Sequence, residues 1–228
     1  LKPGHLLSPG RALCGRITLA DIGIEPDAVF VSGALRPLLF ANGPGLWGDA
    51  TPRLAPDGHK YARGHCLVVA GGIEGVGAPR LAARAALRIG AGLVSIGAPG
   101  SALLAHAGRL PDALMLRRAT SAAEVAALLA DRRRNACVIG PALGLDERAA
   151  QRLAAALASE AALVLDADAL TLMGAEPSLR KMASRRAAST VLTPHEGEFA
   201  RMFGAESAVM AAAGKVERAR AAARSAGA

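Results

Sequence analysis

Short apolar runs alternate with segments of helical periodicity over most of the chain after residue 58. Runs of three to five apolar residues are typical of strands buried in a parallel sheet. The expected strands are residues 66–70, 92–96, 137–139, 162–165 and 190–192. Helical periodicity predicts helices at residues 78–89, 124–129, 147–158 and 215–226.

Two of these helical segments place apolar side chains on a single face. In residues 78–89, Leu81, Ala85 and Ile89 share one face of the helix. In residues 147–158, Leu153 and Leu157 are in register in the same way.

The order of these elements predicts an α/β fold, a layered α/β/α domain with a mostly parallel sheet whose faces are covered by helices. No strand follows the last helical segment, residues 215–226. We therefore expect the layered domain to be incomplete at its C-terminal end.

The first 58 residues differ from the rest in composition and periodicity. They are rich in Pro and Gly, with short extended runs at 16–21 and 28–32 and no helical period. Residues 42–56 have the composition of turn and linker. The chain starts without Met and without a signal-peptide pattern, so we expect it to have been clipped from a longer protein.

Composition excludes some functions. No run approaches the roughly 18 apolar residues of a membrane span, so we expect no membrane partner. The formal net charge of +8 by itself allows nucleic-acid binding. The basic residues are scattered over several predicted helices, however, and only 3% of residues are aromatic and able to stack on bases. A solvated surface, or attraction of an anionic nucleotide, explains the charge better, and we expect no nucleic-acid partner.

The three cysteines, Cys14, Cys66 and Cys137, lie far apart and in no metal-ligand spacing. Cys66 and Cys137 fall in apolar runs, which favours buried, reduced thiols. We therefore expect a cytoplasmic protein and assign no metal ligand.

Four loops that follow predicted strands carry the candidate chemistry, because ligands of open α/β sheets collect at the carboxyl ends of the strands. The first loop, residues 71–77, has glycines that let backbone amides approach a phosphate near a helix N-terminus. A tight turn explains this loop about as well.

The second loop, residues 140–144, ends at Gly144, which permits backbone contact with a substrate. The alternative is a stiff turn followed by a helix cap at Asp146.

The third loop places Asp166 and Asp168 at the end of a predicted strand. Two carboxylates so close together are costly in a buried site unless they are paired or hydrogen-bonded. We expect them to shape the site, and the alternative is that one of them caps the following helix.

The fourth loop begins at Thr193. Thr193 and Glu196 have the spacing of a capping box, with Pro194 at the first helical position. This motif leaves His195 unexplained. A neutral histidine at the positive end of a helix can bind an anionic or hydroxylated ligand, so we favour a functional role for His195.

Together the four loops resemble the NAD(P)H-hydrate dehydratase family. Residues 77–94 are similar to the family's first strand–helix–strand unit. Three further motifs follow in the family's order: Gly-Pro-x-Leu-Gly at 140–144, Asp-Ala-Asp-Ala-Leu at 166–170 and Thr-Pro-His-x-Gly-Glu-Phe at 193–199. Each motif is modest evidence, but all of them in order, spread over about 140 residues, are strong evidence.

The N-terminal piece looks like the tail of the NAD(P)H-hydrate epimerase domain, which precedes the dehydratase in bifunctional repair enzymes. The resemblance therefore divides the chain into an epimerase tail at 1–36, a linker at 37–58 and a truncated dehydratase domain at 59–228.

The resemblance implies a ribokinase-like fold and a specific activity. The family uses ADP or ATP, with Mg²⁺, to dehydrate the S form of NADH or NADPH hydrate and so restore the cofactor. Phosphorylation makes the added hydroxyl a good leaving group, and elimination then restores the dihydropyridine. The positions that the resemblance assigns to substrate binding are Ala78, Gly144 and His195. The supporting positions are Gly77, Gly140, Asp166, Asp168 and Glu198, and by analogy with related kinases Glu198 helps to organise a magnesium–phosphate site.

Two departures from the family pattern matter. Ala142 stands where the family's turn usually has a glycine, so its methyl group is either tolerated or alters the backbone. The family's nucleotide-binding Lys-Gly segment and its catalytic Asp would both lie beyond Ala228. No catalytic residue is therefore assigned, turnover by the chain itself is doubtful, and we expect only weak binding of the hydrated dinucleotide.

Several alternatives stay open from the sequence. A ribokinase-like kinase of a vitamin precursor would share the sheet but lack the epimerase-like tail. A non-catalytic nucleotide-binding relic is the second alternative. The choice between NADH and NADPH hydrate, the choice between ADP and ATP, and homo-oligomerisation are also undecided.

Overall fold

A computed structural model describes residues 2–23, 39–51, 55, 57–108, 111 and 113–228. The chain forms two compact units, Leu1–Leu54 and Ala55–Ala228. Among the described residues, no helix has the length and apolar character needed to cross a bilayer.

In its described residues, 2–23 and 39–51, the first unit forms only single turns of helix. They are α1 (Pro3–Leu6), α2 (Gly10–Leu13), α4 (Pro44–Trp47) and the 3₁₀ turn η1 (Gly48–Ala50). The extended run expected at 16–21 forms no strand, and the one expected at 28–32 lies outside the described residues. No described residue of this unit is buried, so these helical turns lack the tertiary packing that would stabilise longer helices.

The second unit is built on a sheet of six strands, and every pair of neighbouring strands is parallel. The strands are β1 (His65–Val69), β2 (Leu93–Ala98), β3 (Leu114–Arg118), β4 (Ala136–Ile139), β5 (Ala162–Leu165) and β6 (Thr190–Leu192). All five expected strands are present, and β3 was missed because its charged residues interrupt the apolar pattern. The prediction of a mostly parallel α/β sheet is confirmed.

The strand order is β3-β2-β1-β4-β5-β6. The chain adds β2 and β3 on one side of β1 and then β4, β5 and β6 on the other, so the strand order reverses between β1 and β4. Val68 of β1 pairs with Ile96 of β2 on one side and with Val138 of β4 on the other. In open parallel sheets this switch point opens a crevice at the carboxyl ends of the two central strands. The loops that follow β1 and β4 are the first two candidate loops.

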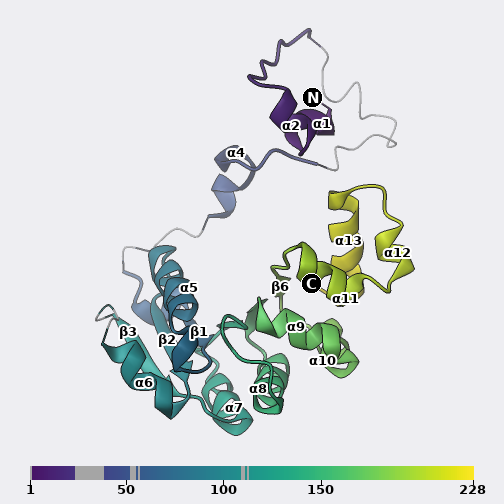
Figure 1. Ribbon diagram of the computed structural model, residues 1–228. Helices are drawn as coiled ribbons and strands as arrows, with labels where there is room; N and C mark the ends of the chain where they lie inside the picture. The colour runs from purple at the N-terminus through teal and green to yellow at the C-terminus, as the bar shows by residue number, and fades with distance from the viewer. Residues whose placement is uncertain (1, 24–38, 52–54, 56, 109–110, 112) are drawn as a thin grey trace. The chain divides into compact units, whose positions relative to one another are not determined.

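Helices cover the two faces of the sheet (Figure 1). On one face, α5 (Gly77–Arg88) and α6 (Gly100–Ala107) share a buried cluster with β1, β2 and β3. The other face is covered by α7 (Ala122–Ala130), α8 (Glu147–Leu157), α9 (Asp168–Ala175) and α10 (Pro177–Ser184). The chain then continues through α11 (Glu196–Phe203), α12 (Ser207–Met210) and α13 (Lys215–Ala226).

The face of α5 that carries Leu81, Ala85 and Ile89 is not the buried one. Leu81 and Ile89 are exposed, Ile89 to 91%, whereas Pro79 and Ala83 are buried. Small side chains on this face let the helix lie close to the sheet, and the larger residues point outward. On α8, by contrast, Leu153 and Leu157, which are in register, are both buried.

Burial on the α5 face decreases from the centre of the sheet toward β6. Val68, Val138, Val164 and Val191 lie side by side in register on this face. Val68 is fully buried, Val138 and Val164 are partly buried, and Val191 is 52% exposed. The layer of helices predicted for this face is therefore complete over β1–β3 only, within the described part of the chain.

Candidate functional site

The first two candidate loops interlock at the switch point. A Cβ atom added to Gly71 would lie 1.7 Å from the carbonyl oxygen of Ala142. A Cβ atom added to Gly75 would lie 2.1 Å from the methyl carbon of Ala142. These two glycines are therefore needed for the close approach of the loop after β1 to the loop after β4.

Ala142 has a φ of +54°, a left-handed conformation that is unfavourable for alanine. Its methyl group is accommodated because Gly75 opposite it has no side chain. The alanine at position 142 is thus accommodated because residue 75 is a glycine, and its positive φ costs backbone strain.

The second and third loops are joined by a hydrogen bond. The amide of Gly144 donates to Oδ2 of Asp168 at 2.9 Å. At Gly140, φ is +129° and an added Cβ would lie 1.8 Å from the carbonyl oxygen of Asp166. Because the amide of Gly144 is already engaged, a ligand at this residue would meet its Cα and carbonyl group.

The third and fourth loops are joined in turn. The hydroxyl of Thr193 donates to Oδ1 of Asp166 at 2.8 Å. Asp168 is the first residue of α9, whose N-cap, Ala167, provides no side-chain cap. The interpretation of one aspartate as a helix cap is therefore wrong, because both carboxylates connect neighbouring loops instead. Between them, Ala167 is held at a φ of +48°.

The start of α11 differs from the capping motif predicted from the sequence. His195 itself is the N-cap, and its Nδ1 accepts from the amides of Gly197 at 3.0 Å and Glu198 at 3.4 Å. Glu198 completes the box by accepting from the amide of His195 at 2.9 Å. Thr193 and Glu196 therefore do not form the box, and capping accounts for one nitrogen of the histidine.

The other nitrogen of His195 is the one that can serve a ligand. Because Nδ1 accepts from backbone amides, the proton of the neutral ring resides on Nε2. Nε2 lies 3.3 Å from Oε1 of Glu198, and the histidine side chain is 68% exposed. An exposed N–H donor at the positive end of a helix suits an anionic or hydroxylated ligand.

Gly77 and Ala78 are the first two residues of α5, and both are exposed. Amides in the first turn of a helix have no acceptor within the helix, so they are available to a ligand. No hydrogen bond in the described part of the chain joins Ala78 to Gly144 or His195. The structure therefore links six of the predicted positions through contacts between the second, third and fourth loops: Gly140, Gly144, Asp166, Asp168, His195 and Glu198. Gly77 and Ala78 lie together at the far end of the first loop.

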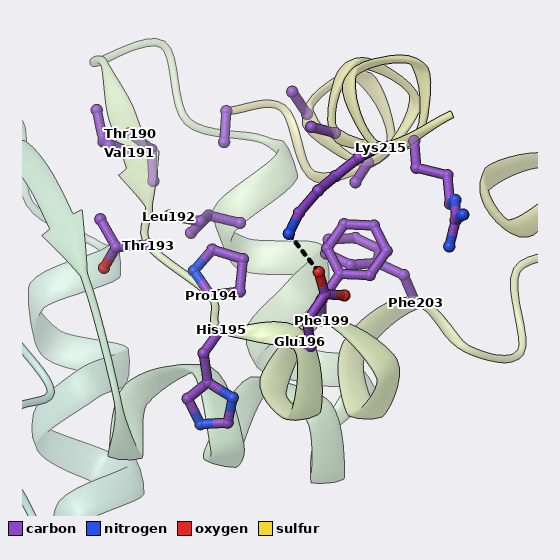
Figure 2. A pocket seen from close by; sticks show the side chains of 15 residues that line it. Thr190, Val191, Leu192, Thr193, Pro194, His195, Glu196, Phe199, Phe203 and Lys215 are labelled. Carbon is purple, nitrogen blue, oxygen red and sulfur yellow. Dashed lines mark ion pairs between the residues drawn. The ribbon is translucent and has the colours of Figure 1, made fainter. Parts of the chain in front are cut away.

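A cavity of about 720 Å³ lies between β6, α11 and α13, next to the fourth loop (Figure 2). Its lining includes His195 but neither Ala78 nor Gly144. Lys215 and Glu196 form an ion pair of 2.5 Å at this cavity, and the hydrogen bond from Lys215 lowers the pKa of Glu196. Nothing in the sequence indicated this pair, because α12 and the turns around it separate the two residues.

The predicted magnesium role of Glu198 does not fit its surroundings. Its carboxylate accepts from the amide of His195, lies beside the imidazole, and is only 8% exposed. Among the residues that the structure describes, no group of three or more His, Cys, Asp or Glu side chains could hold a metal ion.

Comparison with known proteins places this geometry in a family. The model of the NAD(P)H-hydrate dehydratase family matches residues 66–228. The bifunctional NAD(P)H-hydrate repair enzyme of Mycobacterium tuberculosis H37Rv is 35% identical over 206 residues, which cover 90% of this chain and 38% of the relative. The corresponding enzyme of Coxiella burnetii is 32% identical over 203 residues, which cover 89% of this chain and 39% of the relative. The chain thus spans about two fifths of the length of these relatives.

Solved structures agree with the fold. A ribokinase-like superfamily protein from Enterococcus faecalis V583 is similar with a TM-score of 0.63 at 21% identity, covering 83% of this chain and 66% of the other. The ADP/ATP-dependent NAD(P)H-hydrate dehydratase of Bacillus subtilis, crystallised with ATP and Mg²⁺, is 29% identical with a TM-score of 0.53. This match covers 68% of the present chain and 53% of the Bacillus chain. Through residues 66–228, the chain belongs to the NAD(P)H-hydrate dehydratase family.

Proposed function

We propose that the chain supplies the hydrate-binding part of an enzyme that dehydrates the S form of NADH or NADPH hydrate with ADP or ATP as phosphoryl donor. Residues 1–36 would be the end of an epimerase domain and 59–228 part of the dehydratase domain, as in the bifunctional relatives. The observation that carries the proposal is the series of contacts that joins the four loops at the carboxyl ends of the strands.

The reaction needs a hydroxyl group to become a leaving group. Transfer of a phosphoryl group forms a P–O bond to the substrate oxygen and breaks the P–O bond to the nucleotide. Elimination of phosphate then breaks the C–O bond, and loss of a proton from the neighbouring carbon restores the double bond. A nucleotide donor is supported by the Bacillus relative, which was crystallised with ATP and Mg²⁺.

Residues of this chain would bind and orient the hydrate. The free amides at Gly77 and Ala78 face solvent at the positive end of α5 and suit a phosphate of the dinucleotide. The Nε2–H of His195 would donate to a substrate hydroxyl or phosphate. Asp166 and Asp168 act indirectly, by holding the second, third and fourth loops together. Because Glu198 is engaged in capping, no step assigned to these residues depends on magnesium.

A reducing compartment suits the chain. The buried thiols of Cys66 and Cys137 are unpaired, and burial raises the pKa of Cys66 to about 11. We infer a cytoplasmic location, in which such thiols stay reduced.

Calorimetric titration of the folded chain with the S form of NADPH hydrate tests the proposal. We expect saturable binding, and a Kd about tenfold higher for His195→Ala, equivalent to the loss of one hydrogen bond to a ligand. His59→Ala is the matched control, because His59 also caps a short helix through Nδ1, outside the four loops. It should bind as the wild type does.

Two results would count against the proposal. One is the absence of heat with excess hydrate on a sample that circular dichroism shows to be folded. The other is equal weakening of binding by His195→Ala and His59→Ala, which would indicate a general effect of losing a helix cap.

A further inference from the structure

Arg152 is an unusual residue in the core of this unit. It lies on α8 and is only 2% exposed. Its Nη2 donates to the carbonyl oxygen of Ala70 at 2.5 Å, while its buried Nε has no hydrogen-bond partner among the residues that the structure describes. Within the described residues no carboxylate forms an ion pair with it, and burial lowers its pKa to about 10.

Packing alone gives no reason for an arginine at this position. Burial of a guanidinium group without a paired carboxylate costs desolvation free energy that one carbonyl acceptor does not repay. An apolar side chain of similar length would fill the same space without this cost. Groups that oppose stability in this way are concentrated at functional sites.

The position of its acceptor connects Arg152 to the site. Ala70 directly precedes Gly71, the first residue of the loop after β1. Because a trans peptide is planar, a fixed Ala70 carbonyl also fixes the Gly71 amide, which points the opposite way. Gly71 in turn lies against the backbone of Ala142 in the second loop.

Arg152 therefore joins the helix that follows the second loop to the base of the first loop. Its guanidinium group therefore lies at the base of the loop that leads into the start of α5. A buried positive charge acts on anionic ligands with little screening by solvent.

We propose that Arg152 is a positioning residue of this site: it fixes the base of the loop at residues 71–77 and strengthens binding of the phosphate groups of a dinucleotide. The identity of the ligand rests on the proposed function, whereas the effect on the loop does not.

The test compares Arg152→Met and Arg152→Lys with Arg148→Met. Arg148 is the matched control, because it lies one turn earlier on α8 and is exposed. Three quantities are measured for each variant: the Kd for the S form of NADPH hydrate, the amide hydrogen exchange of residues 71–77, and the Tm.

For Arg152→Met we expect a Kd raised about tenfold or more, faster exchange at residues 71–77, and a Tm at or above that of the wild type. Arg152→Lys retains the charge and should recover part of the affinity but not the slow exchange, since an ammonium group lacks the fixed geometry of the guanidinium. Arg148→Met should resemble the wild type in all three quantities.

A lower Tm for Arg152→Met with unchanged Kd and unchanged exchange would overturn the proposal, because it would show an ordinary structural role. If Arg152→Met does not fold, a wild-type Kd and exchange pattern in Arg152→Lys overturns it equally. Failure of the wild type to bind the hydrate would contradict the proposed function alone, and the exchange of residues 71–77 would still decide whether Arg152 holds the loop.

Discussion

Single residues at the crevice are explained by what lies opposite them. Ala142 takes a left-handed conformation, and its methyl group occupies space that a side chain at position 75 would need. Neither residue can be understood alone, since the glycine at one position permits the alanine at the other.

This pairing predicts a strong coupling between positions 75 and 142. Gly75→Ala should lower the free energy of unfolding by about 2 kcal/mol, because two rigid methyl groups would overlap. In an Ala142→Gly background the same change should cost less than about 0.5 kcal/mol. Urea unfolding of the two single variants and the double variant measures the coupling.

Gly72→Ala serves as the control for this cycle. An added Cβ at Gly72 meets no atom of the described residues within 4 Å, and its φ of −68° suits alanine. Its stability should stay close to that of the wild type. Equal losses from Gly75→Ala in both backgrounds would show that the overlap with Ala142 is not the cause.

At the scale of elements, the end of α8 depends on an arginine from a distant segment. Nη1 of Arg186 donates to the carbonyl oxygens of Ala156, Leu157 and Ser159, and Nη2 donates to that of Ala161. The last carbonyl groups of a helix have no amide donor within the helix. A cation near them also interacts favourably with the helix dipole. One side chain thus ends α8 and fixes the turn into β5.

We expect Arg186→Ala to lower the free energy of unfolding by about 2–4 kcal/mol, because several carbonyl groups would lose a charged donor. Arg185→Ala is the matched control, since its side chain is exposed, and it should stay within about 0.5 kcal/mol of the wild type. Chemical denaturation of both variants provides the measurement. Similar losses in the two would mean that Arg186 acts only as a surface charge.

At the scale of the whole molecule, stability should depend on pH through two buried histidines. His65 is hydrogen-bonded to Ser95 at 2.8 Å, and burial, followed by the charge of Arg134, lowers its pKa. Both ring nitrogens of His106 lack hydrogen-bond partners in the described part of the chain, and burial, followed by the charge of Arg80, lowers its pKa. The fold therefore favours the neutral form of each ring.

The unfolded chain consequently binds more protons than the folded chain below the ordinary histidine pKa of about 6.5. The stabilising effect of the neutral rings should be complete above about pH 6.5 and decrease as the pH falls, by at most about 1.4 kcal/mol per pH unit for each histidine. Urea unfolding at a series of pH values measures this slope. His106→Leu should make the slope shallower, and a slope unchanged by that variant would exclude His106 as a source.

Much of the candidate site could be predicted from the sequence because its residues lie in loops that follow recognisable strands. The order of strands and helices follows from local hydrophobic periodicity, and the motif at 193–199 identifies the loop that contains His195. The capping interpretation was wrong because Thr193 and His195, two residues apart, can both act as a cap, and His195 is the one that does. Only the path of the backbone after β6 shows which of the two side chains accepts hydrogen bonds from the first amides of α11.

The sequence by itself determined the α/β class, the parallel strands and the family, since these depend on residues close together in the chain. The tertiary structure alone decided which face of α5 is buried, that Asp166 and Asp168 connect neighbouring loops, and that Arg152 meets the carbonyl group of Ala70. These features depend on contacts between residues far apart in sequence. Such contacts are fixed by strand order and by the direction of each side chain, which local periodicity does not encode.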